Sequence, residues 1–212
     1  MSLIEYFAIH HGEILELTLQ HLWLVGISML LAIAAGVPLG ILLSRRPGLN
    51  KLILGGANVV ETIPSLALFG FLLPAPWFGA RADRLAITAL ALYALLPIIR
   101  NTYTGIVGVD PAVREAARGM GMTGAQMLLK VELPLASSVI LAGIRVATVL
   151  TVGIATIAAA VGSGGLGEFI FRGLAMVDNR VILAGAIPAA IMALVADVAL
   201  GALERRLSYP AR

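Results

Sequence analysis

The sequence contains no cysteine and few charged residues. Without cysteine the chain can form neither a disulfide framework nor a thiolate metal site. Charged residues make up 13% of the sequence and hydrophobic residues 59%. A soluble domain has about 25% charged residues and roughly 45–50% apolar residues. One buried core cannot hold this many apolar side chains in a chain of 212 residues. The composition therefore predicts that much of the chain faces lipid.

Five apolar segments are each long enough to cross the hydrocarbon core of a bilayer, which takes about 20 helical residues. They cover residues 18–44, 52–73, 85–107, 135–161 and 181–203. Lipid offers backbone groups no water, and the alternating pattern of a membrane β-barrel is missing, so these segments should be helices. We expect an all-α membrane protein, a polytopic bundle of about five transmembrane helices within residues 18–207, after an external segment (1–17) and before a cytoplasmic tail (208–212).

The basic residues are shared unevenly between the two sides of these spans. Arg145 is set aside because it falls inside a span. The connections on one side, with the C-terminal tail, then hold ten Lys and Arg residues, and those on the other side hold four. Cytoplasmic connections carry the excess of Lys and Arg, so we expect the N-terminus outside and the C-terminus in the cytoplasm. Basic residues in short tracts between spans do not indicate a nucleic-acid partner.

The cytoplasmic connection of residues 108–134 has the start signals of two short helices. Asp110 followed by Pro111 is typical of a helix N-terminus, and Thr123 with Gln126 forms a capping box. Small and apolar side chains share one face of the first helix: Val113, Ala116, Ala117 and Met120.

This face is suited to insertion into a groove on a partner protein, because small side chains allow close approach. Arg114, Glu115 and Arg118 could then form ion pairs at the rim of the groove. A solvated loop that only connects two spans is the alternative.

The same connection resembles the EAA loop of bacterial ABC importer permeases. The matching residues are Glu115-Ala116-Ala117, Gly121 six residues after the glutamate, and Leu133-Pro134 downstream. In that family the loop docks into the nucleotide-binding subunit. The resemblance implies a coupling site that transmits ATP-driven closure to the spans. Its residues would be Arg114, Glu115, Ala116, Ala117 and Gly121.

Other stretches resemble the permeases of osmoprotectant uptake systems, and this likeness extends from about Leu17 to Leu207. Its clearest segments are residues 61–67, 141–145, 162–167 and 203–207. The resemblance implies a type I ABC importer permease fold in a bacterial cytoplasmic membrane. It also implies import of glycine betaine, choline, carnitine or a related compound, delivered by an extracytoplasmic solute-binding protein.

Five spans are too few to enclose a gated path, so we expect a second permease subunit, identical or different, across a two-fold axis. The sequence has no G-x-x-x-x-G-K-[ST] loop. ATP and Mg would therefore bind to two partner ATPase subunits, and this chain would hold no cofactor and be no enzyme. An ABC permease for another solute such as an amino acid is one alternative. Another is an ion-coupled carrier that uses Glu61 and Asp197.

Three charged residues fall inside the spans at a similar depth. Glu61, Arg145 and Asp197 each lie roughly 12–16 Å from the cytoplasmic ends of their helices. A lone charge there costs at least about 2.5–3.5 kcal/mol, so these side chains should find partners inside the bundle. We expect Glu61 to pair with Arg145. One interpretation is an ion pair that serves only to fix the packing of the helices. The other is that Glu61, beside Pro64 and Ser65, contributes negative potential to a pathway for a cationic or zwitterionic solute.

Residues 162–167 match the G-x-G-x-x-G pattern of dinucleotide-binding proteins, but the preceding short strand and the later acidic residue are missing. We instead expect an external turn and a short amphipathic helix. A gate would be formed there by Gly164, Gly165, Gly167 and Glu168, and an ordinary glycine-rich helix cap is the alternative. No metal site is expected, because adjacent histidines such as His10 and His11 point about 100° apart on a helix.

Overall fold

The computed structural model describes residues 2–75 and 81–207, and every regular element in these ranges is helical. Four helical stretches are long and apolar enough to cross a membrane. They are α1 (Leu3–Arg45), α4 (Ala82–Val107), the stretch Gly124–Val161 that contains α7 (Leu133–Ala158), and α9 (Asn179–Leu207). A fifth candidate is the bent pair of α2 (Asn50–Thr62) and α3 (Ser65–Leu72). The expected all-α membrane bundle is therefore confirmed.

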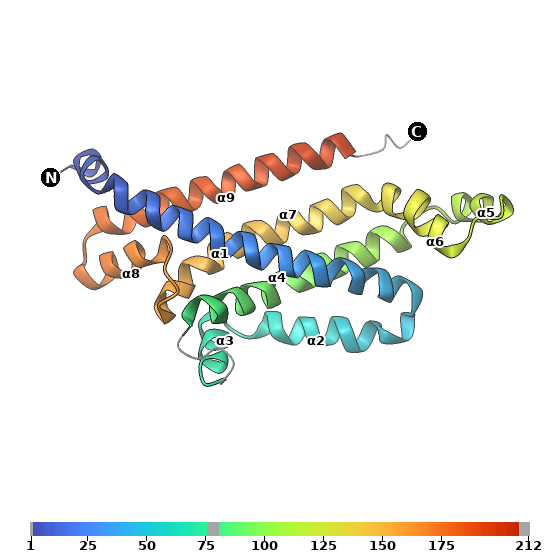
Figure 1. The fold of residues 1–212 in the computed structure, drawn as a ribbon, viewed down its shortest axis with the longest axis horizontal. Coiled ribbons are helices and arrows are strands. Elements are labelled where there is room, and N and C mark those ends of the chain that lie inside the picture. Colours follow the sequence, from blue (N-terminus) through green and yellow to red (C-terminus); the bar gives the residue numbers. More distant parts are fainter. Residues whose placement is uncertain (1, 76–80, 208–212) are drawn as a thin grey trace.

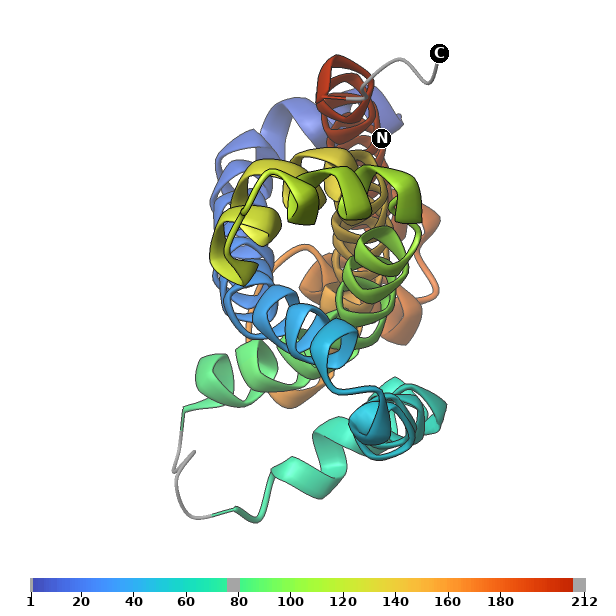
Figure 2. The ribbon, with the colours of Figure 1, turned by 90° about the vertical axis from the view of Figure 1, so that its right-hand side faces the viewer.

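The long helices run side by side along the long axis of the molecule (Figure 1). α1 packs on α4, α4 on α7, and α7 on α9. α5 (Pro111–Gly119) and α6 (Gly124–Met127) lie at the end near the C-terminus, and α8 (Gly167–Met176) lies at the end near the N-terminus. Seen from the α5 end, α2 and α3 lie to one side of the four long helices (Figure 2).

α1 begins at Leu3, well before the apolar run that starts at residue 18. Ser2 and Glu5 form a capping box, in which the Glu5 backbone N–H donates to the Ser2 hydroxyl at 3.3 Å and the Ser2 N–H donates to the Glu5 carboxylate at 2.7 Å. The N-terminal segment is therefore a continuation of the first spanning helix. Hydropathy alone misses this start, because the cap is polar.

The second span is broken. α2 ends at Thr62, Ile63 is extended with a ψ of 127°, and α3 then leaves at a bend of 102°. Pro64 explains the break, because proline has no N–H to donate and disfavours helical backbone at the residue before it. The hydroxyl of Tyr93 on α4 donates a hydrogen bond to the carbonyl of Ile63, which lies at this break. The helix predicted over residues 52–73 is thus divided at Pro64 into α2 and α3.

Close approach of α1, α4 and α7 depends on glycine. A Cβ atom at Gly40 of α1 would lie 2.5 Å from the Cβ atom of Thr102 on α4. A Cβ atom at Gly143 of α7 would lie 2.5 Å from the Cβ atom of Asn101. Because no side chain fits at these distances, the helix backbones are in direct contact here, as is common between helices in lipid.

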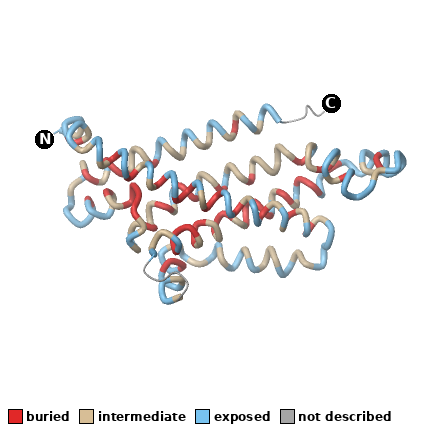
Figure 3. Tube along the Cα trace, in the orientation of Figure 1, coloured by how far each residue is buried: buried red, intermediate tan, exposed pale blue. Residues whose placement is uncertain are grey.

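Burial is concentrated where α1, α4 and α7 meet (Figure 3). α2 has no buried residue, and α9 has few. Both helices expose large apolar side chains, such as Leu52 on α2 and Leu194 and Val198 on α9. These outer faces are suited to contact with lipid or with a neighbouring subunit.

Candidate coupling and translocation sites

The first short helix predicted in the connection of residues 108–134 is present as α5. A carboxylate oxygen of Asp110 accepts a hydrogen bond from the Ala112 backbone N–H at 2.8 Å, and Pro111 occupies the first helical position. The helix ends at Gly119. Gly121 then adopts a φ of +76°, a conformation that favours glycine, and turns the chain toward α6.

The predicted capping box at the start of α6 is also present. The Gln126 backbone N–H donates to the Thr123 hydroxyl at 3.3 Å, and the Thr123 N–H donates to the Gln126 side chain at 2.8 Å. However, α6 continues through a π-helical turn (Leu128–Glu132) into α7. Pro134 cannot donate to the carbonyl four residues earlier, and the wider π turn accommodates that loss. The prediction of a second separate surface helix is therefore wrong.

The exposed face of α5 differs from the predicted one. Glu115, Ala116 and Met120 are exposed, but Ala117 is buried against its own chain. Ala117 therefore anchors α5 to the bundle. Glu115, Ala116 and Gly121 are the residues of the predicted coupling site that are exposed and remain open to a partner.

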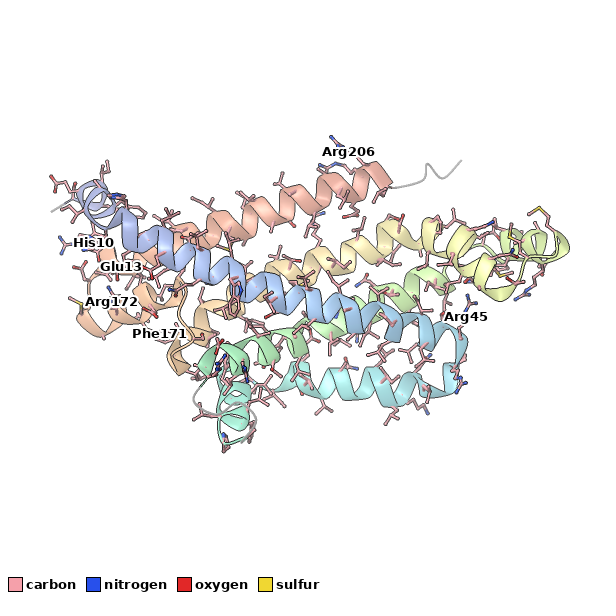
Figure 4. All side chains as sticks on the ribbon, in the orientation of Figure 1. His10, Glu13, Arg45, Phe171, Arg172 and Arg206 are labelled. Atoms are coloured by element: carbon pink, nitrogen blue, oxygen red, sulfur yellow. The ribbon has the colours of Figure 1, made fainter. Side chains whose placement is uncertain are left out.

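A buried carboxylate joins α5 to the spans. Glu132, in the π turn, is 1% exposed and accepts hydrogen bonds from both Nη atoms of Arg45 at the end of α1. The Nε atom of Arg114 on α5 lies 3.3 Å from Oε1 of the same carboxylate. We call Arg45, Arg114 and Glu132 the charge cluster. Arg45 marks its place in Figure 4, at the α5 end of the molecule.

Arg114 therefore points into its own chain, where its Nη2 also donates to the carbonyl of Ile106 at the end of α4. The prediction that places Arg114 at the rim of a partner groove is wrong. Sequence reasoning also missed Glu132. The available signal was a lone carboxylate between apolar residues at the start of a span, directly before Leu133-Pro134.

A cavity of about 290 Å³ lies beside the break between α2 and α3. Its lining residues are Glu61, Thr62, Ile63, Pro64, Ser65, Tyr93, Leu150, Thr151 and Ile154. Three residues of the predicted pathway, Glu61, Pro64 and Ser65, are thus brought together. Glu61 is exposed, and within the described part of the chain it has no ion-pair partner. A larger groove of about 560 Å³ between α1 and α9 has an almost wholly apolar lining and is better suited to a lipid chain.

Arg145 pairs with Asp197 and not with Glu61. Its Nε and Nη2 atoms donate to the two carboxylate oxygens of Asp197 at 2.6 and 2.9 Å, and its Nη1 lies 3.4 Å from Glu204. Arg145 lies on α7 and both carboxylates lie on α9, which packs against α7, whereas α2 packs on α4. A shared depth does not fix the direction in which a side chain leaves its helix, so the predicted Glu61–Arg145 pair is wrong.

The glycine-rich turn joins α7 to α8 at the end opposite α5. Gly164 and Gly165 have φ values of 83° and 82°, which favour glycine. The Gly165 N–H donates to the Gln20 side chain on α1 at 3.3 Å. A Cβ atom at Gly167 would overlap the carbonyl of Thr156, so α8 packs directly on the end of α7. The short helix expected after this turn is confirmed as α8.

The polar residues around α8 form surface ion pairs. Arg172 of α8 lies 2.8 Å from Glu13 of α1 and 4.0 Å from Glu168, and Figure 4 shows Glu13 and Arg172 close together at this end. Beneath them, His21 of α1 is buried, and its Nε2 donates to the Val152 carbonyl of α7 at 3.1 Å. No group of three His, Asp or Glu side chains gathers as a metal would require in residues 2–75 and 81–207.

The end of the turn between α8 and α9 is held by Asp178. Its carboxylate accepts hydrogen bonds from the Arg180 side chain at 2.7 and 3.0 Å and from the Arg180 backbone N–H at 2.9 Å. The hydrogen bond from the Arg180 side chain makes the largest contribution, and together these bonds lower the pKa of Asp178 to about 2. Asp178 thus caps the first turn of α9 as an anion.

Residues 19–209 match the model of the family of binding-protein-dependent transport system inner membrane components. The chain belongs to this family. As a permease of the family it is a non-enzymatic, multi-pass membrane subunit of an ABC importer, as the EAA-like loop predicts.

Curated relatives cover almost the whole permease. The carnitine transport permease OpuCB of Listeria monocytogenes is 45% identical over 98% of this chain and 94% of that protein. The osmoprotectant import permease OsmW of Salmonella typhimurium is 45% identical over 96% of both chains. The choline transport system permease OpuBB of Bacillus subtilis is 41% identical over 97% and 94%. The predicted resemblance to osmoprotectant permeases is confirmed.

Two solved transporters share the fold of the permease. A chain of the inward-facing MetNI methionine ABC transporter superposes with a TM-score of 0.80 at 24% identity, over 90% of this chain and 94% of that one. A chain of an amino acid ABC transporter crystallised with histidines gives a TM-score of 0.78 at 19% identity, over 97% and 99%. The predicted type I ABC importer permease fold is confirmed.

Proposed function

We propose that this permease moves a small quaternary amine, such as glycine betaine, choline or carnitine, into the cytoplasm as part of an ATP-driven importer. The observation that carries the proposal is the kinship, over nearly the whole chain, with permeases named for carnitine, osmoprotectant and choline transport. Such solutes combine a permanent positive charge with apolar methyl groups.

The cavity beside Pro64 supports this choice of solute. Its volume of about 290 Å³ suits a small molecule. Glu61 supplies a negative charge at its edge, Ser65 and Thr151 supply hydroxyls, and Leu150 and Ile154 supply apolar surface. A carboxylate beside apolar walls attracts a cation without requiring a specific hydrogen-bond donor on it. We infer that Glu61, Pro64 and Ser65 lie along the translocation pathway.

We infer that the working complex contains two permease subunits, identical or different, two ATPase subunits that hold ATP and Mg, and an external solute-binding protein. The unpartnered apolar faces of α2 and α9 support a second membrane subunit. The excess of basic residues at the end that carries α5 and the C-terminus supports a cytoplasmic position for that end. The N-terminus and the turn before α8 would then lie outside.

In this complex, nucleotide binding would draw the ATPases together and carry α5 with them through the exposed Glu115 and Ala116. The spans would then change between inward-open and outward-open arrangements, with the turn at Gly164, Gly165 and Gly167 and the neighbouring Glu168 forming an outer gate. The two arrangements would bind nucleotide with different affinities, and this difference would shift the equilibrium between them.

Reconstitution of the complete importer in proteoliposomes tests the proposed solute. Glycine betaine, choline and carnitine are compared with methionine and histidine as stimulators of ATP hydrolysis in the presence of the cognate binding protein. We expect stimulation by at least one quaternary amine and by neither amino acid. Stimulation by an amino acid alone would overturn the proposal, and accumulation of solute by the permease without ATPase would point instead to an ion-coupled carrier.

A further inference from the structure

The charge cluster contains a buried carboxylate at the start of a membrane span. Glu132 is 1% exposed, and a buried charge is costly unless it is paired. The pairing crosses the fold, because Arg45 belongs to the end of α1, Arg114 to α5, and Glu132 to the turn before α7. Arg114 also reaches the last turn of α4 through the Ile106 carbonyl. The charge cluster thus connects α5 to the ends of α1, α4 and α7.

The two arginines hold Glu132 in different ways. Arg45 donates from two nitrogen atoms to the two carboxylate oxygens, the geometry in which a guanidinium holds a carboxylate most firmly. The Nε atom of Arg114 lies 3.3 Å from Oε1, but its buried N–H is not aligned for a hydrogen bond. A movement of α5 that aligned this N–H would let Arg114 share the carboxylate more fully, so the pairing within the cluster depends on the position of α5.

The backbone that carries this carboxylate is not regular α-helix. Glu132 ends a π-helical turn, which separates the short α6 from the long α7. π turns inside helices occur often at functional sites. A force on the Glu132 side chain would therefore act at the junction between α6 and α7.

The geometry points to Glu132 as a positioning residue that carries the displacement of α5 to α1 and α7. This inference rests on the proposed docking of α5 against an ATPase. Glu132 does not contact solute or nucleotide; it acts through Arg45 and Arg114. A purely static ion pair would stabilise the fold without affecting how much transport accompanies each hydrolysis event.

The test uses the complete reconstituted importer with Glu132→Gln, which keeps the shape of the side chain and removes its charge. We expect the ATPase to remain bound and basal ATP hydrolysis to persist, while solute moved per ATP hydrolysed falls about fivefold or more. Lys130→Gln is the matched control, because Lys130 is an exposed charge on the same π turn. An unchanged ratio of transport to hydrolysis in the assembled variant would overturn the inference.

A second measurement separates this inference from the choice of solute. The chain has no native cysteine, so a Ser65→Cys variant can report on the cavity through its rate of thiol labelling. Trapping nucleotide should change that rate in the parent, and the change should be lost when Glu132→Gln is added. If no quaternary amine is transported but this difference appears, the proposed solute fails and the role of Glu132 stands.

Poor folding of Glu132→Gln would not leave the inference open. Arg114→Lys keeps the positive charge but has a single nitrogen, which cannot reach both the carboxylate and the Ile106 carbonyl as a guanidinium does. Its assembled complex should show the same loss of labelling change and of transport per ATP. A normal value of both in Arg114→Lys would contradict the proposed role.

Discussion

At the scale of the residue, Glu61 presents a carboxylate to the cavity without an ion pair in the described part of the chain. Replacement by Gln removes the negative potential and keeps the shape. We expect uptake to fall roughly tenfold, the equivalent of about 1.4 kcal/mol. ATPase binding and basal hydrolysis should be unchanged. Uptake in proteoliposomes measures the effect, and Glu61→Asp, which keeps the charge, should retain most activity. Equal uptake by Glu61→Gln and the parent would remove Glu61 from the pathway.

The contribution of Asp178 to the stability of the fold depends on pH. Its hydrogen bonds with Arg180 lower the pKa in the folded protein from 3.8 to about 2. A lowered carboxyl pKa stabilises the fold above the unfolded value, and this contribution disappears as pH falls from about 4 to about 2. Hydrogen exchange at the first turn of α9 should therefore be faster in Asp178→Asn than in the parent at pH 6. The difference should disappear near pH 2, and a difference that grows on acidification would contradict this account.

At the scale of the element, α5 is a short helix whose exposed side carries Glu115 and Ala116. Glu115→Arg reverses a charge on this surface without disturbing the buried Ala117. We expect the ATPase to be lost on purification, because an interface with mismatched charges is weakened. Co-purification measures this. Glu16→Arg, an exposed change on α1 toward the opposite end, is the control and should retain the ATPase. Retention by both variants would exclude Glu115 from the docking surface.

The contact between α7 and α4 makes a second prediction at this scale. A methyl group added by Gly143→Ala would meet Asn101 and the Pro97 carbonyl, so the helices must separate. Overpacking of this kind costs about 1–3 kcal/mol. Gly153→Ala, on the same helix, has no atom within 4 Å of the new methyl group, and it should be neutral or slightly stabilising. Thermal unfolding in detergent compares them, and equal midpoints would contradict the close approach.

The local signals of the sequence predict elements well and contacts poorly. Asp110 and the Thr123 capping box act within one helical turn, so the starts of α5 and α6 could be predicted. The partner of Arg145 could not be predicted, because two carboxylates, Glu61 and Asp197, share its depth and only the rotation of the helices selects between them. The charge cluster joins positions far apart in the chain, and no periodicity reports such a meeting.

At the scale of the whole molecule, α1, α4 and α7 supply most of the main core, α9 packs on α7, and the remaining elements are attached at the sides and ends (Figures 1 and 3). The apolar runs alone are sufficient to predict this bundle, because lipid leaves helices as the stable solution for spans of this length. The broken α2–α3 segment departs from that rule. Irregular backbone at membrane depth is tolerated where it lines a cavity, as it does here.

The attachment of α2 has a consequence for the life of the protein in the cell. This helix packs on α4 but buries none of its own residues. A segment with so few internal contacts opens at little free-energy cost. A copy of the subunit made in excess of its assembly partners would expose α2 to cellular proteases. The abundance of the subunit should therefore follow that of its partners and not its own rate of synthesis.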